Sequence, residues 1–484
     1  MQNSKLSEHD FKKGKFSTAF GEFIKQHGQE NIWFLDRLPE YLWLLLILHR
    51  YGRKEGMARC ARILSNIQSI APQVALPKMS ALLSLTEEVQ RSIFGRIIEI
   101  VTAEVISPLT IIFTYSKNPC FAECFSVPNL SVEDRFDILK EVLKEAVNHQ
   151  SDISTDIRFL IIYFEWLSGT LVMEKEMAEL VFQYPQLSHE DVKIKLICTM
   201  IRSMEIAIPN SERDETYLKL FWEGISQMDD CQLGYVGYDA VTKNVEEYVA
   251  ALKKIMLYYS SVLNSITPLD NRLTVLLGIA TYAYKRILEV VEHSLYNSIS
   301  GRSAVRCVIE CYIVTKYLLH EEHAHQDIWT EYQYYGIGQY KLIVERILES
   351  GKDIRESHVN APYLDALVQE YIDKEFIEMD TSYFDRKNVR EKAIIAGEKE
   401  LFGFYYDYDS AFEHGLWGAI RESGMLKCTS PAHQYHCIPD IENIQKLPSV
   451  WNDCRDNMRK IIEVLRELYG LPKHLYCEVI GRGN

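Results

Sequence analysis

The stretch Gly301–Leu319, GRSAVRCVIECYIVTKYLL, decides the class of fold. Its apolar residues recur three and four positions apart, at Val305, Val308, Ile309 and Tyr312. This spacing places side chains on one face of an α-helix. The same spacing continues through most of the chain, without a series of alternating strands joined by hairpin turns. We therefore predict an all-α protein.

The organisation into domains follows from length and local composition. A chain of 484 residues is longer than one hydrophobic core usually serves. An acidic, glycine-bearing stretch without helical periodicity follows residue 228. We expect an N-terminal helical domain over residues 1–228, a linker over 229–243 and a C-terminal helical bundle over 244–484. Because no repeat of fixed period is present, multi-helix bundles are favoured over a solenoid.

Charge and hydropathy limit the partners. The formal net charge of −15 makes the surface as a whole repel nucleic acid, although 53 lysines and arginines leave room for a local basic cleft. The strongest apolar run, Leu42–Leu48, has about seven residues against the roughly 20 that cross a bilayer. It predicts a buried helix and no membrane segment.

The N-terminus and the cysteines predict the compartment. The first residues, MQNSKLSEHDFKKGKF, lack the apolar core of a signal peptide. The 11 cysteines are scattered, without the dense spacing of a secreted disulfide scaffold. We expect a cytoplasmic protein with reduced thiols.

A polar stretch, Tyr405–Pro439, carries the first candidate site. Its sequence is YYDYDSAFEHGLWGAIRESGMLKCTSPAHQYHCIP. Tyr406, Ser410, His414 and Trp417 are spaced four, four and three apart, which predicts one shared helical face. A histidine one turn from a hydroxyl is suited to act as a general base. A hydrogen-bonded histidine inside a bundle would give the same pattern.

Upstream, two arginines and a glutamate repeat every four residues, at Arg302, Arg306 and Glu310. If this helix faces His414, an Arg–Glu–His site results that could bind and cleave a phosphodiester, with arginine stabilising the developing negative charge. The alternative is an intrahelical ion pair that fixes the register of the bundle.

Four residues of the types that bind zinc lie close together, at Cys428, His433, His436 and Cys437. The spacing differs from that of a standard zinc finger. A loop packed by hydrogen bonds is the favoured interpretation. Zinc remains an alternative, and with it a zinc-dependent hydrolase that uses Cys428, His433 and His436.

Three segments together resemble a known family: GRSAVRCVIECYIVTKYL, REKAIIAGEKELFGFYYDYDSAFEHGLWGA and CTSPAHQYHCIP. They are similar to a bacterial helical family, domain of unknown function 5677, over roughly residues 250–468. The resemblance places Arg306, Glu310, Tyr406, Ser410 and His414 at the motif positions. The bacterial setting of the family implies a role in stress or antiphage defence.

The leading hypothesis is a bacterial defence or stress effector with a metal-independent ribonuclease site and no cofactor. We expect His414 to act as general acid or base and Arg306 to bind the phosphate. Glu310 is expected to orient Arg306, and Ser410 to support the site through its hydroxyl. Substrate contacts are expected from Arg302, Tyr406 and Trp417. The alternative is a non-enzymatic helical sensor or scaffold that binds a partner protein or a small ligand. Expected partners are RNA, a protein from the same operon, or a second copy of the chain.

Overall fold

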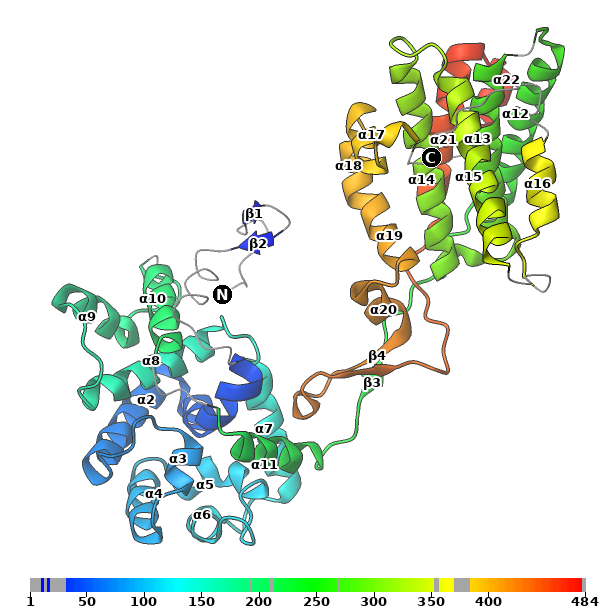
Figure 1. The fold of residues 1–484 in the computed structure, drawn as a ribbon. Coiled ribbons are helices and arrows are strands. Elements are labelled where there is room, and N and C mark those ends of the chain that lie inside the picture. The colour runs from blue at the N-terminus through cyan, green and yellow to red at the C-terminus, as the bar shows by residue number, and fades with distance from the viewer. Residues whose placement is uncertain are drawn as a thin grey trace. The chain divides into compact units, whose positions relative to one another are not determined.

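The computed structural model describes residues 10–12, 15–17, 32–191, 193–208, 213–268, 270–351, 357–369 and 384–480. Helices make up most of these residues, which confirms the all-α prediction. The chain forms two compact units (Figure 1). Unit 1 comprises Met1–Gly234 and Lys427–His436, and unit 2 comprises Tyr235–Leu426 and Cys437–Asn484. The first division lies inside the stretch 229–243, for which the composition predicts a linker.

Unit 1 begins with a short antiparallel hairpin of β1 (Asp10–Lys12) and β2 (Lys15–Ser17), in which Phe11 is opposite Phe16. Helices follow in this order: η2 (Trp33–Arg37), α2 (Leu38–Ile70), α3 (Met79–Leu83), α4 (Glu87–Val101), α5 (Ala103–Ile106), η3 (Ser107–Ile111), α6 (Pro119–Phe125), α7 (Val132–Ala146), α8 (Asp152–Leu167), α9 (Lys175–Phe182), η4 (Tyr184–Gln186), α10 (Ile194–Ile206) and α11 (Glu215–Ser226).

Helix α2 is the centre of unit 1 and packs against α4 and α8. The side chains of Leu42–Leu48 are all buried in its core, which confirms the prediction for this run. The helix bends at Gly52, whose φ of 71° is readily adopted only by glycine. A capping box formed by Ser131 and Asp134 begins α7, because each side chain satisfies a backbone N–H of the other.

Unit 2 contains these helices in chain order: α12 (Val245–Ser265), α13 (Asn271–Glu292), η5 (Leu295–Asn297), α14 (Ile299–Glu321), α15 (Ile328–Ser350), α16 (Ala361–Gln369), η6 (Phe384–Arg386), α17 (Val389–Ile395), α18 (Lys399–Leu401), η7 (Phe402–Tyr406), α19 (Asp407–Glu413), α20 (Trp417–Gly424), α21 (Trp451–Tyr469) and α22 (Lys473–Ile480).

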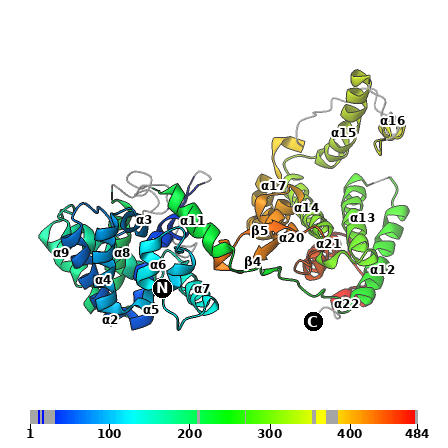
Figure 2. The ribbon, with the colours of Figure 1, turned by 90° about the horizontal axis from the view of Figure 1, so that it is seen from below.

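Helix α14 is the centre of unit 2 and contacts α13, α17, α19 and α21. Figures 1 and 2 show α12 and α13 side by side in both views. The apolar face predicted for α14 is buried, since Val305, Val308 and Ile309 are at most 1% exposed. Its first turn is unusually close to the preceding chain, because a Cβ added at Gly301 would lie 2.1 Å from the carbonyl oxygen of Leu295. Only glycine fits there.

Residues 427–436 belong to unit 1 although they follow the helices of unit 2 in sequence. Strand β3 (Leu233–Gly234) pairs antiparallel with β4 (Met425–Cys428), so that Leu233 is opposite Cys428 and Gly234 is opposite Lys427. The sheet has the order β3-β4-β5, with β5 at Cys437–Pro439. Across the described parts of the chain, no helix has the length and apolarity that a membrane span requires.

Candidate functional site

Arg306 of α14 forms hydrogen bonds with both Tyr406 and Ser410, which the sequence predicts to share one helical face. Its Nε donates a hydrogen bond of 2.9 Å to Ser410 Oγ, and its Nη2 donates one of 2.7 Å to the hydroxyl of Tyr406. The guanidinium also lies 4.8 Å from the centre of the Tyr406 ring. These contacts place α14 and α19 side by side, as in Figure 1.

Glu310 completes this network from the next turn of α14. Its Oε2 accepts a hydrogen bond of 3.2 Å from the Tyr406 hydroxyl and lies 3.7 Å from Arg306 Nη2. The side chains of Arg306 and Glu310 are 21% and 31% exposed, so the network lies at the edge of the bundle. We call Arg306, Glu310, Tyr406 and Ser410 the arginine network. All four are residues that the sequence pattern selected.

His414 and Trp417 lie outside the arginine network. Helix α19 ends at Glu413, and Gly415 has a φ of 58° that turns the chain. The next helix begins at Trp417, whose side chain is exposed. The predicted common helical face therefore ends at His414, the exposed residue that closes the helix, whose backbone N–H donates a 3.0 Å hydrogen bond to the carbonyl of Ser410. Within the described residues, the imidazole of His414 makes no hydrogen bond or ion pair.

Arg302, one turn before Arg306, is buried in a clamp. Its Nη1 lies 3.4 Å from Asp409 Oδ1, and its Nη2 donates a 2.9 Å hydrogen bond to the carbonyl of Pro448. The guanidinium also lies over the rings of Tyr408 and Phe412. With 5% of Arg302 exposed, its role in this geometry is to hold α19 on α14. The substrate contact expected from Arg302 stays a prediction, because the side chain is mostly buried in this clamp.

The carboxyl of Asp409 has an unusual protonation equilibrium. It is 2% exposed, and this burial raises its pKa to about 7, more than the nearby charge of Arg302 lowers it. Asp453 contributes a further increase because it is a like charge. Asp409 was not among the residues selected from the sequence, and the signal available was its place one residue before Ser410.

A groove lies beside the arginine network, between α13, α14 and α15. Its volume is about 600 Å³, within the range of small-molecule sites. Four tyrosines and several aliphatic residues line it, and Glu310 is the charged residue among the described lining residues. The lining residues are Val275, Gly278, Ile279, Tyr282, Cys307, Glu310, Cys311, Val314, Tyr332, Gln333, Tyr335, Gly336, Ile337 and Tyr340. Glu310 thus belongs both to the groove and to the arginine network.

Unit 1 contains a set of residues that could hold a metal ion. Cys428, His433 and His436 lie together, as the sequence pattern suggested, and the fourth member is Cys231. Cys437, which the sequence pattern included, is outside the group that the structure brings together. Cys231 is distant in sequence, so local spacing gave no signal for it.

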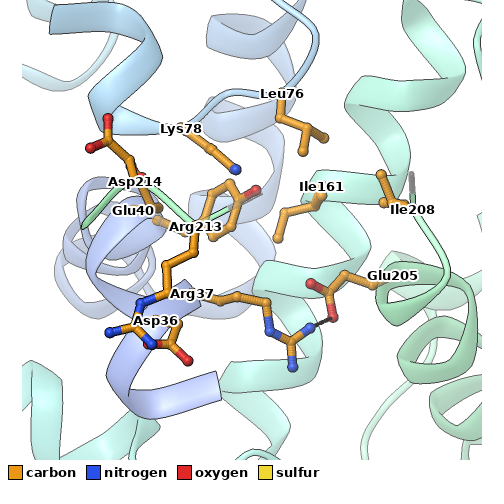
Figure 3. Close-up of a pocket in the computed structure, with 11 residues that line it drawn as sticks. Asp36, Arg37, Glu40, Leu76, Lys78, Ile161, Glu205, Ile208, Arg213 and Asp214 are labelled. Atoms are coloured by element: carbon orange, nitrogen blue, oxygen red, sulfur yellow. Dashed lines mark hydrogen bonds and ion pairs between the residues drawn. The ribbon is translucent and has the colours of Figure 1, made fainter. Parts of the chain in front are cut away.

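Unit 1 contains a small hollow lined by paired charges (Figure 3). Its volume of about 10 Å³ is room for roughly one water molecule. Arg37 Nη1 donates a 2.5 Å hydrogen bond to Glu205, and Arg213 lies 3.4 Å from Asp36. Burial raises the pKa of Glu40 in its wall. These groups compensate one another, so the hollow is part of the packing of unit 1.

Comparison with known proteins agrees with the sequence resemblance. Neither the curated proteins nor the solved structures contain a match to this chain. Part of the chain does match a family model, and this part includes α13, α14 and α19, together with every residue of the arginine network. Residues 271–432, which lie in the C-terminal half, match the model of a family of unknown function, DUF5677.

Proposed function

We propose that unit 2 is a ligand-binding helical module whose ligand occupies the groove between α13, α14 and α15. The observation that carries the proposal is the position of Glu310. Its Oε2 is held by Arg306 and Tyr406, while its Oε1 has no hydrogen-bond partner among the described residues. A carboxylate oxygen is therefore available at the wall of an otherwise uncharged groove.

The lining of the groove indicates the chemistry of the ligand. Tyrosine rings attract cations through their π faces, and a single carboxylate accepts hydrogen bonds from an ammonium or amine. Aliphatic residues such as Val275, Ile279 and Val314 suit an apolar body. We therefore assign the ligand to the class of small amine-bearing or quaternary ammonium compounds with an apolar or aromatic part.

The arginine network serves this site by fixing the carboxylate. Arg306 is held by Ser410, Tyr406 and Glu310, so its own position is defined by three partners. Tyr406 in turn is 6% exposed and stacks on Phe402 with ring centres 4.9 Å apart. A carboxylate held on a rigid helix loses little conformational entropy when a ligand binds.

Calorimetric titration with benzyltrimethylammonium tests the proposal. Benzyl alcohol is the control ligand, because it keeps the ring and lacks the charge. In Gly278→Trp the indole should fill the groove, and a Cβ at this position meets no heavy atom within 4 Å. Gly95→Trp on α4 of unit 1 is the matched control, since its added Cβ is equally unhindered.

We expect benzyltrimethylammonium to bind the wild type and Gly95→Trp more tightly than benzyl alcohol does. Binding should be lost in Gly278→Trp and weakened about fivefold in Glu310→Gln, since a partly exposed charge contributes about 1 kcal/mol. The glutamine keeps an acceptor for Tyr406, so the network should persist. Equal affinities in all variants would refute the proposal.

A second candidate is the metal-independent ribonuclease, favoured by one observation. Nη1 of Arg306 has no partner among the described residues and is not buried, so it is available to a phosphate. His414 is exposed one turn after Ser410. The ribonuclease would use His414 as general acid or base and Arg306 as phosphate clamp. Both candidates, ligand binding and RNA cleavage, would suit a stress or defence effector.

RNA cleavage assays distinguish the two candidates. The ribonuclease requires cleavage that persists in chelator and disappears in the folded variant His414→Ala. Gly278→Trp should leave such cleavage unchanged, because the groove is not its site. Cleavage that is equal in the wild type and in His414→Ala would remove this second candidate.

A further inference from the structure

Four metal-ligating side chains from two distant parts of the sequence converge in unit 1. The ligand atoms of Cys231, Cys428, His433 and His436 all lie within 4.8 Å of one another. The Sγ of Cys231 is 2.8 Å from Nδ1 of His433 and 3.2 Å from Nε2 of His436. Ligands in a tetrahedral site with bonds of about 2.0–2.3 Å are roughly 3.3–3.8 Å apart. The four atoms are thus already near the separations that a tetrahedral ion requires.

The outer nitrogen of His433 is held in the manner of a metal ligand. Its Nε2 lies 3.1 Å from the carbonyl oxygen of Ser226 and 3.0 Å from that of Asp229. Because carbonyl oxygens only accept hydrogen bonds, Nε2 must carry the hydrogen. Nδ1 is then left with its lone pair directed toward Cys231. A hydrogen bond of this kind from the second nitrogen is the usual support of a metal-bound histidine.

We infer that Cys231, Cys428, His433 and His436 bind one structural zinc ion. Two thiolates and two imidazoles form the ligand set that favours zinc in tetrahedral geometry. All four positions are filled by protein atoms, whereas a catalytic zinc keeps one position for water. The inferred role is therefore structural, and the zinc-dependent hydrolase considered from the sequence is not the form that this ligand set supports.

The ion would hold residues 427–436 in unit 1. Ala432 is 1% exposed within the core of unit 1, and the ring of Tyr435 lies 5.8 Å from that of Phe34. His433 follows Cys231 by 202 residues. Because the site forms only when these distant residues are brought together by folding, the binding free energy of the ion adds to the stability of the folded state.

The backbone of the loop between His433 and His436 adopts a conformation of raised energy. Gln434 and Tyr435 have φ values of 56° and 52°, which residues with a side chain adopt unfavourably. Both lie between the two histidine ligands in sequence. Metal binding would offset the conformational cost and fix both imidazoles toward one point.

Metal analysis of the full chain tests the inference. The protein is expressed without added metal, and zinc is measured by mass spectrometry after gel filtration. We expect about one zinc ion per chain in the wild type and little in Cys231→Ser or His436→Ala. Cys437→Ser is the matched control, because this cysteine neighbours His436 and lies outside the ligand group; it should retain the ion.

A second measurement uses only the wild type, so it tests the inference even where the variants fail to fold. Zinc is removed from the wild type, and cobalt(II) is added as a spectroscopic probe. Intense visible bands of tetrahedral cobalt with thiolate charge transfer are expected, and zinc should displace them. Removal of the metal should also increase hydrogen exchange in residues 427–436.

Three results would overturn the inference. One is a wild-type chain that binds neither zinc nor cobalt, and another is a Cys231→Ser variant that keeps a full equivalent of zinc. The third is loss of zinc in Cys437→Ser at wild-type folding. None of these results depends on ligand binding in unit 2, because the four ligands all belong to unit 1.

Discussion

Unit 2 should lose stability as the pH rises from 6 to 8, because of Asp409. The pKa of this carboxyl is about 7 in the folded protein and about 3.9 in an unfolded chain. Over this range the folded state therefore binds a proton that the unfolded state has already released. The stability that this proton contributes is present below the unfolded pKa and disappears as the pH rises through 7.

The magnitude follows from the two protonation states. With a pKa of about 7, Asp409 in the folded protein is about one-tenth ionised at pH 6 and about nine-tenths ionised at pH 8. The corresponding loss in the free energy of unfolding is about 1.4 kcal/mol, equivalent to a tenfold change in the unfolding equilibrium. Asp409→Asn should lack this contribution, although it is less stable overall because Arg302 remains buried without its carboxylate.

Hydrogen exchange of the amides in α14 and α19 provides the assay. The wild type and Asp409→Asn are compared at the same pH, so that intrinsic exchange rates cancel. The protection of the wild type relative to the variant should fall about tenfold between pH 6 and pH 8. A ratio that stays constant, or rises, would show that Asp409 does not release its proton between pH 6 and pH 8 and would contradict this prediction.

Two further substitutions test the packing around α14. Gly301→Ala should destabilise unit 2 by about 1–3 kcal/mol, because its Cβ would meet the Leu295 carbonyl, whereas Gly278→Ala should stabilise it by about 0.5–1 kcal/mol. Chemical denaturation of both variants measures this, and equal effects would contradict the close approach at Gly301. Ser410→Ala should cost about 1 kcal/mol, since Nε of Arg306 loses its acceptor. An unchanged unfolding midpoint would mean that water replaces the hydroxyl without loss.

The sequence was sufficient for features that depend on local pattern. Apolar spacing identified the buried run Leu42–Leu48 and the core face of α14. The capping box at Ser131 was visible because its two partners are three residues apart. The repeats of four also selected Arg306, Glu310, Tyr406 and Ser410, and the structure brings these residues together.

Features that depend on distant residues or on helix ends were not predictable in the same way. Gly415 ends α19, so Trp417 lies on a different helix from Ser410, although a glycine after a helix is a recognisable stop signal. Cys231 joins the histidines of the loop through tertiary folding alone. The buried state of Asp409 likewise depends on how α19 packs on α14.

Hydrogen exchange can locate bound benzyltrimethylammonium on the protein and so shows directly whether the groove between α13, α14 and α15 is its binding site. We expect slower exchange in peptides of α13, α14 and α15 that line the groove, and no such protection in Gly278→Trp. Protection elsewhere in the chain, or identical protection in Gly278→Trp, would contradict the assignment of this groove as the binding site.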